Sequence, residues 1–188
     1  MFETTLFPSI VEQALQYATQ KHNGQYRKTS NYPYIWHCMS VSRHVENFKN
    51  SHNKDLLLVS ALLHDVVELY KTKEEQNTEL HSIADLFGFK VASLVSELTT
   101  DKNEANKVGK TEYLKQKLLQ MSSYALVIKL CDRLDNISDL QRASLEFKEK
   151  YKKETIDIID FIFSNRKNLS KTHLQIISEI KKTLNTII

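Results

Sequence analysis

Apolar residues recur every three to four positions along most of this chain, the spacing that places them on one face of an α-helix. Polar stretches at 23–34, 72–82 and 99–110 separate these segments and predict loops, with a helix beginning within 78–85 as an alternative. The pattern therefore predicts an all-α fold, a bundle of roughly 8–10 helices. The predicted helices cover about residues 10–22, 35–49, 54–70, 91–98, 110–121, 123–143, 146–163 and 171–187.

The composition supports helices joined by short, polar connections. The 188 residues include only 3 glycines and 2 prolines, whereas average usage gives about 13 and about 9 at this length. Because β-sandwiches and barrels need many Gly- and Pro-rich turns, this shortage argues against both classes. The length suits a single domain spanning 1–188, and no linker or internal repeat divides the chain.

The net charge, the lack of long apolar runs and the N-terminal sequence argue against several kinds of partner and location. Lys and Arg number 26 and Asp and Glu 23, and the formal net charge of +3 is far weaker than the basic stripe of a nucleic-acid-binding protein. No apolar run approaches the ~18 residues of a membrane span, and the N-terminus lacks the basic and apolar regions of a signal peptide. Cys38 and Cys131 form no disulfide framework. We therefore expect a cytoplasmic protein with no nucleic-acid or membrane partner.

Candidate chemistry lies where polar residues occupy positions on apolar helical faces. His37 lies on the apolar stripe of the helix predicted near 35–49. His64 and Asp65 follow an apolar run in ALLHDVVE, and Asp132 follows another in ALVIKLCDRLDN. Burying such groups is costly unless they are paired or bind a metal ion.

Two imidazoles and two carboxylates from three helices form a mixed nitrogen and oxygen ligand set. Such a set suits Mn²⁺, Fe²⁺ or Zn²⁺ better than Ca²⁺. A divalent ion of this kind lowers the pKa of water and so supplies a nucleophile. Glu68, one turn beyond His64 on the same face, is placed to accept a proton from that water.

Each of these residues also has a purely structural explanation. His37 is explained by a hydrogen bond inside the core, and an adjacent His-Asp pair occurs often by chance. Asp132 has Lys129 and Arg133 on neighbouring turns, and the Asn136 amide lies where it can bond Asp132. The residues alone therefore leave metal binding and structural pairing open.

Three motifs together resemble a known family. In order along the chain, RKTSNYPYIWH, ALLHDVVE and KLCDRLDN are similar to the hydrolase domain of the Rel/Spo family, a branch of the HD-domain metal-dependent phosphohydrolases. The motif-bearing core covers about 11–143. The C-terminal helices of 145–188 lie beyond it, and they either close the core or form the face of a homodimer.

The resemblance implies an HD-domain helical bundle that removes pyrophosphate from the 3′ position of the small nucleotides ppGpp and pppGpp. It implies a bound Mn²⁺ ion, with another divalent transition metal as the alternative. The implied metal ligands are His37, His64, Asp65 and Asp132, the implied catalytic residues are Glu68 and Asp65, and the implied substrate-binding residues are Arg27, Lys28, Asn136 and Lys107.

One position departs from the family pattern. The family has Glu-Asp in the motif HDxxED, whereas this chain reads HDVVEL, so that Leu69 replaces the second acid. Because loss of a general acid or base costs about 10²–10⁴ in rate, two alternatives to an active ppGpp hydrolase stay open. One is a catalytically weakened protein that binds a nucleotide as a sensor. The other is an HD phosphohydrolase that acts on a different nucleotide.

Overall fold

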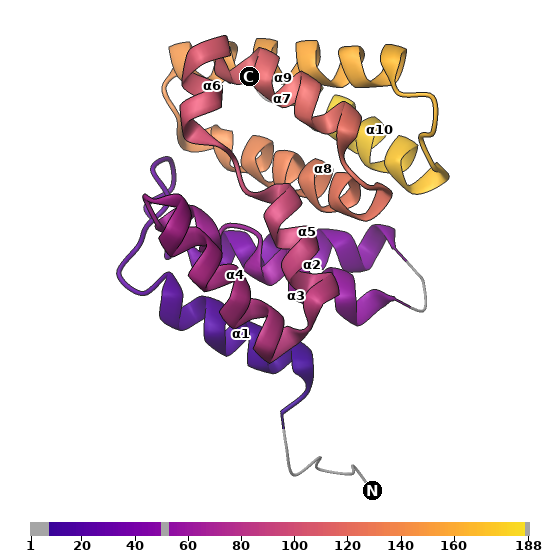
Figure 1. The fold of residues 1–188 in the computed structure, drawn as a ribbon. Coiled ribbons are helices and arrows are strands. Elements are labelled where there is room, and N and C mark those ends of the chain that lie inside the picture. Colours follow the sequence, from indigo (N-terminus) through magenta and orange to yellow (C-terminus); the bar gives the residue numbers. More distant parts are fainter. Residues whose placement is uncertain (1–7, 50–52, 187–188) are drawn as a thin grey trace, which may run out of the picture.

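The computed structural model describes residues 8–49 and 53–186 and shows an all-α protein (Figure 1). Within these residues the backbone forms ten α-helices and two 3₁₀-helices, and the only β pairing is an isolated bridge between Tyr26 and Pro33. The all-α prediction is therefore confirmed. The helices are α1 (Ile10–Lys21), α2 (Ile35–Phe48), α3 (Lys54–Leu63), η1 (Val66–Leu69), α4 (Lys73–Phe87), α5 (Phe89–Leu98), α6 (Lys102–Val108), α7 (Lys110–Gln120), α8 (Ser123–Ser138), η2 (Asp139–Arg142), α9 (Leu145–Asn165) and α10 (Lys171–Thr186).

The helices form two layers, with α1 to α5 in the lower layer and α6 to α10 in the upper layer (Figure 1). α3 lies at the centre of the lower layer, where it packs against α1, α2 and α5. Every residue from Leu57 to Leu63 is buried, because this helix is apolar all round. α3 contributes side chains to both hydrophobic clusters of the protein and so joins them.

α8 connects the two layers, and α10 closes its outer side. α8 packs against α2 below and against α10 above. The apolar face of α10 is buried through Ile176, Ile177, Ile180 and Leu184. Of the two expectations for the C-terminal helices, closure of the core is the one that the packing supports, and a homodimer face stays a prediction.

α2 carries a buried histidine and an exposed tryptophan at adjacent positions. His37, Val41 and Val45 are buried along one face, as the apolar stripe predicts. Trp36, the neighbour of His37, is 53% exposed and stacks on Tyr32 with ring centroids 4.9 Å apart. Helical geometry turns consecutive side chains about 100° apart, so adjacent residues serve the interior and the surface.

The predicted helix of 54–70 is shorter than expected. α3 ends at Leu63, and a separate 3₁₀-helix covers Val66–Leu69. Asp65 has φ −104° and ψ −3°, values of the bridge region in which many active-site residues lie. A continuous helix would direct His64 and Asp65 about 100° apart. The break instead allows these adjacent side chains to meet.

The stretch 99–110, predicted as a loop, contains α6, and in 72–82 the alternative of a helix is the correct one, although α4 begins at Lys73 and not within 78–85. α4 begins with a capping box, in which Glu75 N donates to Thr72 Oγ1 at 3.2 Å and Thr72 N donates to Glu75 Oε2 at 3.0 Å. Asp101 caps the start of α6, and its carboxylate accepts from the backbone of Asn103 and Glu104. α6 buries a single side chain among its 7 residues, so apolar periodicity does not reveal it. The capping patterns T-x-x-E and D-x-x-E were the readable signals.

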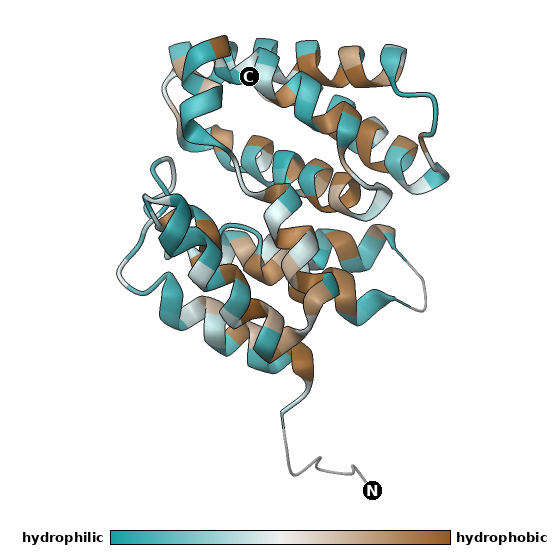
Figure 2. Ribbon diagram, viewed as in Figure 1, coloured by the Kyte–Doolittle hydropathy of each residue, from teal (hydrophilic) through white to brown (hydrophobic). Residues whose placement is uncertain are grey.

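Apolar residues concentrate in the interior, mainly on α3, α5 and α8 (Figure 2). Across 8–49 and 53–186, no helix has a stretch that is both long and apolar enough to cross a membrane. Residues 1–7, on which the signal-peptide prediction rests, and Ile187, the end of the last predicted helix, lie outside the described residues.

Candidate metal centre and the adjoining cavity

Four predicted ligands meet where the two layers join. α2 supplies His37, the turn after α3 supplies His64 and Asp65, and α8 supplies Asp132. One ligand atom from each of His37, His64 and Asp132 lies within 4.8 Å of the others, and all three residues are buried. Asp65 Oδ2 lies 3.1 Å from His64 Nε2 and 3.7 Å from His37 Nε2. We refer to these four residues as the His–Asp cluster.

Both imidazoles are held from behind, so that their Nε2 atoms face the cluster. His64 Nδ1 lies 2.8 Å from the carbonyl oxygen of Ala61, which can only accept, so Nδ1 carries the hydrogen. His37 Nδ1 lies 2.6 Å from Asp135 Oδ2, a closer partner than Arg27 Nη1 at 3.3 Å, so it also donates. Each neutral ring therefore directs the Nε2 lone pair inward, the arrangement typical of metal-ligating histidine.

His64 Nε2 indicates that the cluster requires a cation. This buried atom has no hydrogen-bond partner among the residues described, although Asp65 Oδ2 lies 3.1 Å away. A lone pair that faces a carboxylate oxygen at this distance is repelled unless a proton or a metal ion lies between the two atoms. Burial opposes a charge on His64, but the charge of Asp65 outweighs burial and raises the pKa of His64, so a proton occupies this position until a metal ion displaces it. The donor set of two imidazoles and two carboxylates suits a divalent transition metal in that role.

The charged side chains in and around the cluster carry a net negative charge when both histidines are neutral. Six such side chains contact one another or the two histidines, and each is at most 16% exposed. With both histidines neutral, four carboxylates and two cations give a net charge of −2, which a divalent ion offsets. The carboxylates are Asp65, Asp132, Asp135 and Asp139, and the cations are Arg27 and Lys129.

The same charges govern protonation of the cluster. Burial opposes a charge on His37, but hydrogen bonds with Asp132 and Asp135 outweigh burial and raise its pKa to about 9. Burial also opposes ionisation of Asp65, yet the neighbouring His64 holds the pKa of that carboxyl below its usual range. Because a histidine must be neutral to bind a metal ion, metal binding releases protons here.

Asp132 contacts two of the three residues that the sequence analysis named as its possible structural partners. Lys129 Nζ lies 2.8 Å from Oδ2, and Asn136 Nδ2 donates to Oδ1 at 2.5 Å. Arg133 instead lies over the ring of Tyr151, 4.9 Å from its centroid. Since Oδ1 still faces the two histidines, at 3.3 Å from His37 Nε2, structural pairing and metal binding do not exclude each other.

Glu68 lies on η1, three residues beyond Asp65. Its Oε1 accepts from Thr100 N at 2.8 Å, and its carbonyl oxygen accepts from Lys102 Nζ at 3.0 Å. Burial opposes the charge of Lys129, but carboxylates that include Asp132 and Glu68 raise its pKa. Glu68 therefore acts electrostatically on the site, although it is not one of the residues whose ligand atoms meet there.

A cavity of about 520 Å³ opens beside the cluster. Tyr34 lines it and donates to Asp65 Oδ2 at 2.6 Å, and Asn136 lines it and donates to Asp132. Cations and aromatic faces are the groups that bind phosphates and nucleobases. The lining includes three cations, Arg27, Lys28 and Lys110, and four aromatic rings, Tyr26, Tyr34, Phe147 and Tyr151. The cluster residues themselves do not line this cavity, and Tyr34 and Asn136 connect it to them. A larger groove of about 670 Å³ between α1, α2 and α3 is mostly apolar.

Arg27, which the resemblance implies as a substrate residue, is engaged within the protein. Its guanidinium group forms an ion pair with Asp135 and, through Nε at 2.9 Å, with Asp139. Its Nη2 donates to Asn136 Oδ1 at 3.1 Å. Arg27 thus lines the cavity while it holds two residues that contact members of the His–Asp cluster.

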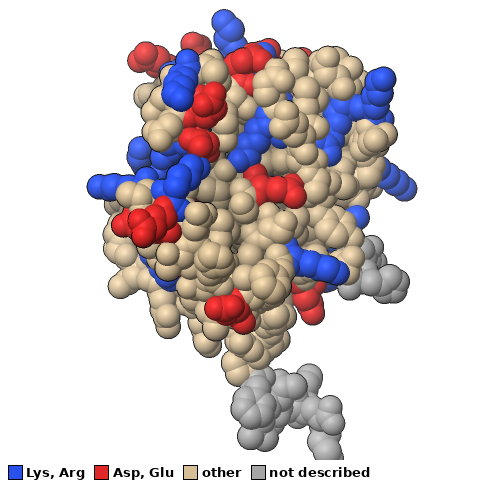
Figure 3. Space-filling view, in the orientation of Figure 1, with Lys and Arg blue, Asp and Glu red and all other residues tan. Residues whose placement is uncertain are grey.

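The two predicted lysines have different surroundings. Lys28 lines the cavity. Lys107 lies on α6 with a side chain that is 72% exposed, and its Nζ lies 3.6 Å from Glu104 Oε2. Lys110, at the start of α7, lines the cavity although it was not predicted to do so. Figure 3 shows basic side chains gathered at the left of the molecule, level with the junction of the two layers. The role of Lys107 stays a prediction.

Sequence reasoning missed Tyr34 and Asp135. Both lie three residues from a ligand, Tyr34 before His37 and Asp135 after Asp132. Side chains three apart are neighbours on a helix surface. A search for polar residues at this spacing from each candidate ligand would have found them.

Comparison with known proteins gives a consistent result. The family model described as HD domain matches residues 14–169. The guanosine-3′,5′-bis(diphosphate) 3′-pyrophosphohydrolase MESH1 of Drosophila melanogaster is 35% identical over 130 residues, which cover 69% of this chain and 68% of that protein. MESH1 of Xenopus tropicalis is 34% identical over 145 residues, covering 73% of each.

A third relative is longer. The guanosine-3′,5′-bis(diphosphate) 3′-pyrophosphohydrolase of Aquifex aeolicus is 32% identical over 157 residues, but the match spans only 20% of its length. A solved structure, described as a metazoan ortholog of SpoT that hydrolyses ppGpp, superimposes with a TM-score of 0.73 at 28% identity, covering 95% of this chain and 98% of that one. The match spans nearly the whole of both chains, so the two share one fold.

The family model covers most of the chain, and MESH1 proteins match it along more than two thirds of their own length. Membership of this family implies dependence on a divalent metal ion, in agreement with the His–Asp cluster. The chain belongs to the HD-domain family and, within it, to the group that contains the MESH1 pyrophosphohydrolases.

Proposed function

We propose that this protein is a Mn²⁺-dependent hydrolase that removes pyrophosphate from the 3′ position of ppGpp and pppGpp. The observation that carries the proposal is a buried His–Asp cluster, with surroundings two negative charges in excess, beside a cavity lined by cations and aromatic rings. The MESH1 relatives, named for this activity, and the similar structure of a ppGpp hydrolase support it.

The His–Asp cluster and Glu68 of η1 have different roles in the reaction. His37, His64, Asp65 and Asp132 would hold the ion, and their mixed donors suit Mn²⁺. When bound, the ion supplies Lewis acidity toward water and a phosphate oxygen. Glu68 accepts a proton from the attacking water. Water adds to the phosphorus that is bonded to the 3′ oxygen, and cleavage of that bond yields GDP and pyrophosphate from ppGpp.

The cavity binds the rest of the nucleotide. Arg27 and Lys28 neutralise phosphate charge, where most of the stabilisation in phosphoryl transfer arises. Arg133 lies over the ring of Tyr151 and Phe147 stacks on it. Tyr26, which lines the same cavity and is 59% exposed, offers a face on which guanine can stack. Asn136 bonds the sugar or its phosphate. Lys107 is included as a contact of the pyrophosphate on the resemblance alone.

The decisive experiment measures metal content and then pyrophosphate release. The protein is incubated with ppGpp, pppGpp, GTP and NADP⁺ in the presence of Mn²⁺, Mg²⁺ or Zn²⁺. We expect ppGpp and pppGpp to be hydrolysed fastest with Mn²⁺, and GTP, which has no 3′ phosphate, to remain intact. Turnover of a different nucleotide would move the substrate assignment within the HD family. Protein that holds metal but hydrolyses nothing would refute the enzymatic proposal.

A second candidate function, binding without turnover, is favoured by Leu69. This residue follows Glu68 on η1, where the family has a second acid. A sensor of this kind would bind ppGpp tightly and leave it intact. In that case Leu69→Asp would create activity, with a gain on the order of 10²–10⁴ if the missing acid is limiting. Measurable turnover by the unmodified protein excludes the sensor.

We also propose that the chain acts as one domain in the cytoplasm. α3 joins both hydrophobic clusters, and the two cysteines are buried and unpaired, as in reducing compartments.

A further inference from the structure

We propose that Arg27 and Asp135 form an outer shell that orients the metal centre, so that Arg27 serves the metal ligands as well as the cavity. The inference rests on the metal site within the proposed function. It concerns residues behind the ligands, and it assigns Asp135 a positioning role and adds one to Arg27.

The first step is the contact between Asp135 and His37. Asp135 Oδ2 lies 2.6 Å from His37 Nδ1, and both side chains are at most 8% exposed. A carboxylate in this position requires the hydrogen on Nδ1 and therefore leaves Nε2 free to bind a cation. Its negative charge also makes the imidazole a stronger donor to a metal ion. Without Asp135, the ring would be free to take the opposite tautomer.

The second step is the reach of Arg27. The guanidinium group contacts Asp135 through Nη1 and Asn136 through Nη2. Asp135 holds His37 on α2, and Asn136 donates to Asp132 Oδ1 on α8 at 2.5 Å. One side chain thus supports ligands from two different helices. A planar fork with several donors can do this, whereas a lysine ammonium cannot span both partners with the same geometry.

The third step is that Arg27 is itself held in place. Asp139, at the start of η2, contacts Arg27 Nε at 2.9 Å and also accepts from the hydroxyl of Thr29. Asp139 contacts no member of the His–Asp cluster. It therefore provides a matched control, because it is an aspartate that pairs with the same arginine but does not touch a ligand.

The test measures Mn²⁺ affinity in protein without nucleotide, by electron paramagnetic resonance titration. We expect Asp135→Asn and Arg27→Gln each to weaken Mn²⁺ binding by about 10–100-fold, the usual cost of losing an outer partner. Asp139→Asn should weaken it less, because Asp139 acts only through Arg27, and Lys28→Gln should change it least, because Lys28 contacts neither a ligand nor the outer shell. In the Zn²⁺-loaded protein, long-range ¹H–¹⁵N spectra should show the His37 hydrogen on Nδ1, and Asp135→Asn should disturb that signal selectively.

If Arg27→Gln does not fold, Arg27→Lys keeps the charge and removes the fork, and an intermediate loss of affinity is expected. Wild-type Mn²⁺ affinity in folded Asp135→Asn and Arg27 variants would overturn the outer shell and leave Arg27 to the cavity alone. Unmodified protein that binds neither Mn²⁺ nor Zn²⁺ would remove the metal site, and with it both proposals. Protein that binds metal but does not hydrolyse ppGpp would refute only the proposed function.

Discussion

Two polar networks, one around Glu79 and the other the His–Asp cluster, include residues on either side of η1. They differ in charge and in how completely their hydrogen bonds are made. Around Glu79, the hydroxyls of Tyr17 and Tyr70 donate at 2.7 and 2.8 Å, and Lys21 Nζ donates at 2.6 Å. Lys21 also donates to the Tyr70 oxygen at 2.8 Å. The charges of Glu79 and Lys21 cancel, and the polar groups of this network pair with one another. The His–Asp cluster and its surroundings have a net charge of −2 when both histidines are neutral, the form that binds a metal ion, and His64 Nε2 then has no donor to pair with.

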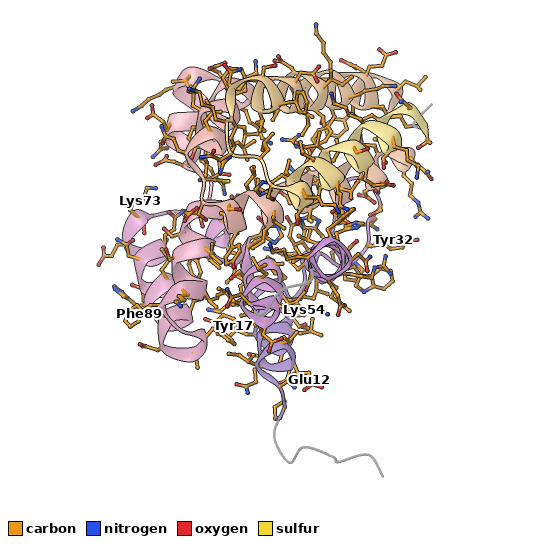
Figure 4. All side chains as sticks on the ribbon, turned by 90° about the vertical axis from the view of Figure 1, so that its right-hand side faces the viewer. Glu12, Tyr17, Tyr32, Lys54, Lys73 and Phe89 are labelled. Atoms are coloured by element: carbon orange, nitrogen blue, oxygen red, sulfur yellow. The ribbon has the colours of Figure 1, made fainter. Side chains whose placement is uncertain are left out.

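The difference separates a network that stabilises the fold from one that requires a ligand. A buried network whose groups all have partners needs nothing else, whereas an unsatisfied one is costly until a ligand completes it. Tyr17 lies between α1 and α4 in Figure 4, where its ring packs edge-on against Phe87 at 5.5 Å. Because Tyr70 directly follows η1, the Glu79 network also anchors the segment that carries Glu68.

The largest effect is expected from removing two ligands. The double variant His64→Ala with Asp65→Ala should abolish metal retention and ppGpp hydrolysis, far beyond the ~10–100-fold cost of an outer partner. Its thermal stability should no longer depend on whether a chelator is present, because the variant binds no metal ion in either condition. Elemental analysis and circular dichroism melting measure both. Unchanged metal retention would refute the ligand assignment.

Disrupting the Glu79 network should lower the stability of the fold and leave metal binding unchanged. Glu79→Gln removes the charge that pairs with Lys21, and we expect a loss of about 2 kcal/mol in the free energy of unfolding. Mn²⁺ affinity should stay at the wild-type value. Urea denaturation with a parallel metal titration gives both numbers, and Glu74→Gln, an exposed change on the same helix, is the control. A fall in metal affinity without a fall in stability would contradict the comparison.

A smaller effect is expected at the edge of the cavity. Lys110→Gln should raise KM for ppGpp about fivefold, equivalent to ~1 kcal/mol for one charged contact. Lys107→Gln should raise it less, because that side chain is 72% exposed and lies beside Glu104. Steady-state kinetics on both variants compare them directly. An equal or larger effect at Lys107 would favour the position that the resemblance implies.

The smallest effect concerns alkaline pH. Burial, together with the hydrogen bond to Glu79, raises the pKa of Tyr17 to about 12 from 10.0. Above the unfolded pKa the unfolded state loses this proton while the folded state keeps it, so stability should fall as pH rises from about 10 toward about 12. Urea midpoints across this range should show the decline, and Tyr17→Phe should flatten it. A slope that Tyr17→Phe leaves unchanged would exclude this residue as its source.

The sequence singled out the four residues of the His–Asp cluster because they interrupt or directly follow apolar helical runs, and the structure brings them together. His37 and Asp132 interrupt stripes that the structure buries, and α1, α2, α9 and α10 follow the predicted bounds closely. The helix predicted over 123–143 ends at Ser138, where η2 follows. α6 was missed because it buries a single side chain, and α4 was given only as a helix beginning within 78–85 because its first turns are polar, although the caps of both were readable. The contact between Arg27 and Asp135 joins residues 108 apart in sequence. No local pattern reveals such a pair, since it arises only when the 23–34 loop packs against α8.

The position of Trp36 gives this protein a built-in optical reporter. It is the only tryptophan of the chain, so all indole emission comes from one place. It lies on α2 beside His37 but faces outward, so a change at the metal centre reaches it through one helix. Binding of a nucleotide that carries a fluorescent group should therefore be visible by energy transfer from Trp36, with no label added to the protein.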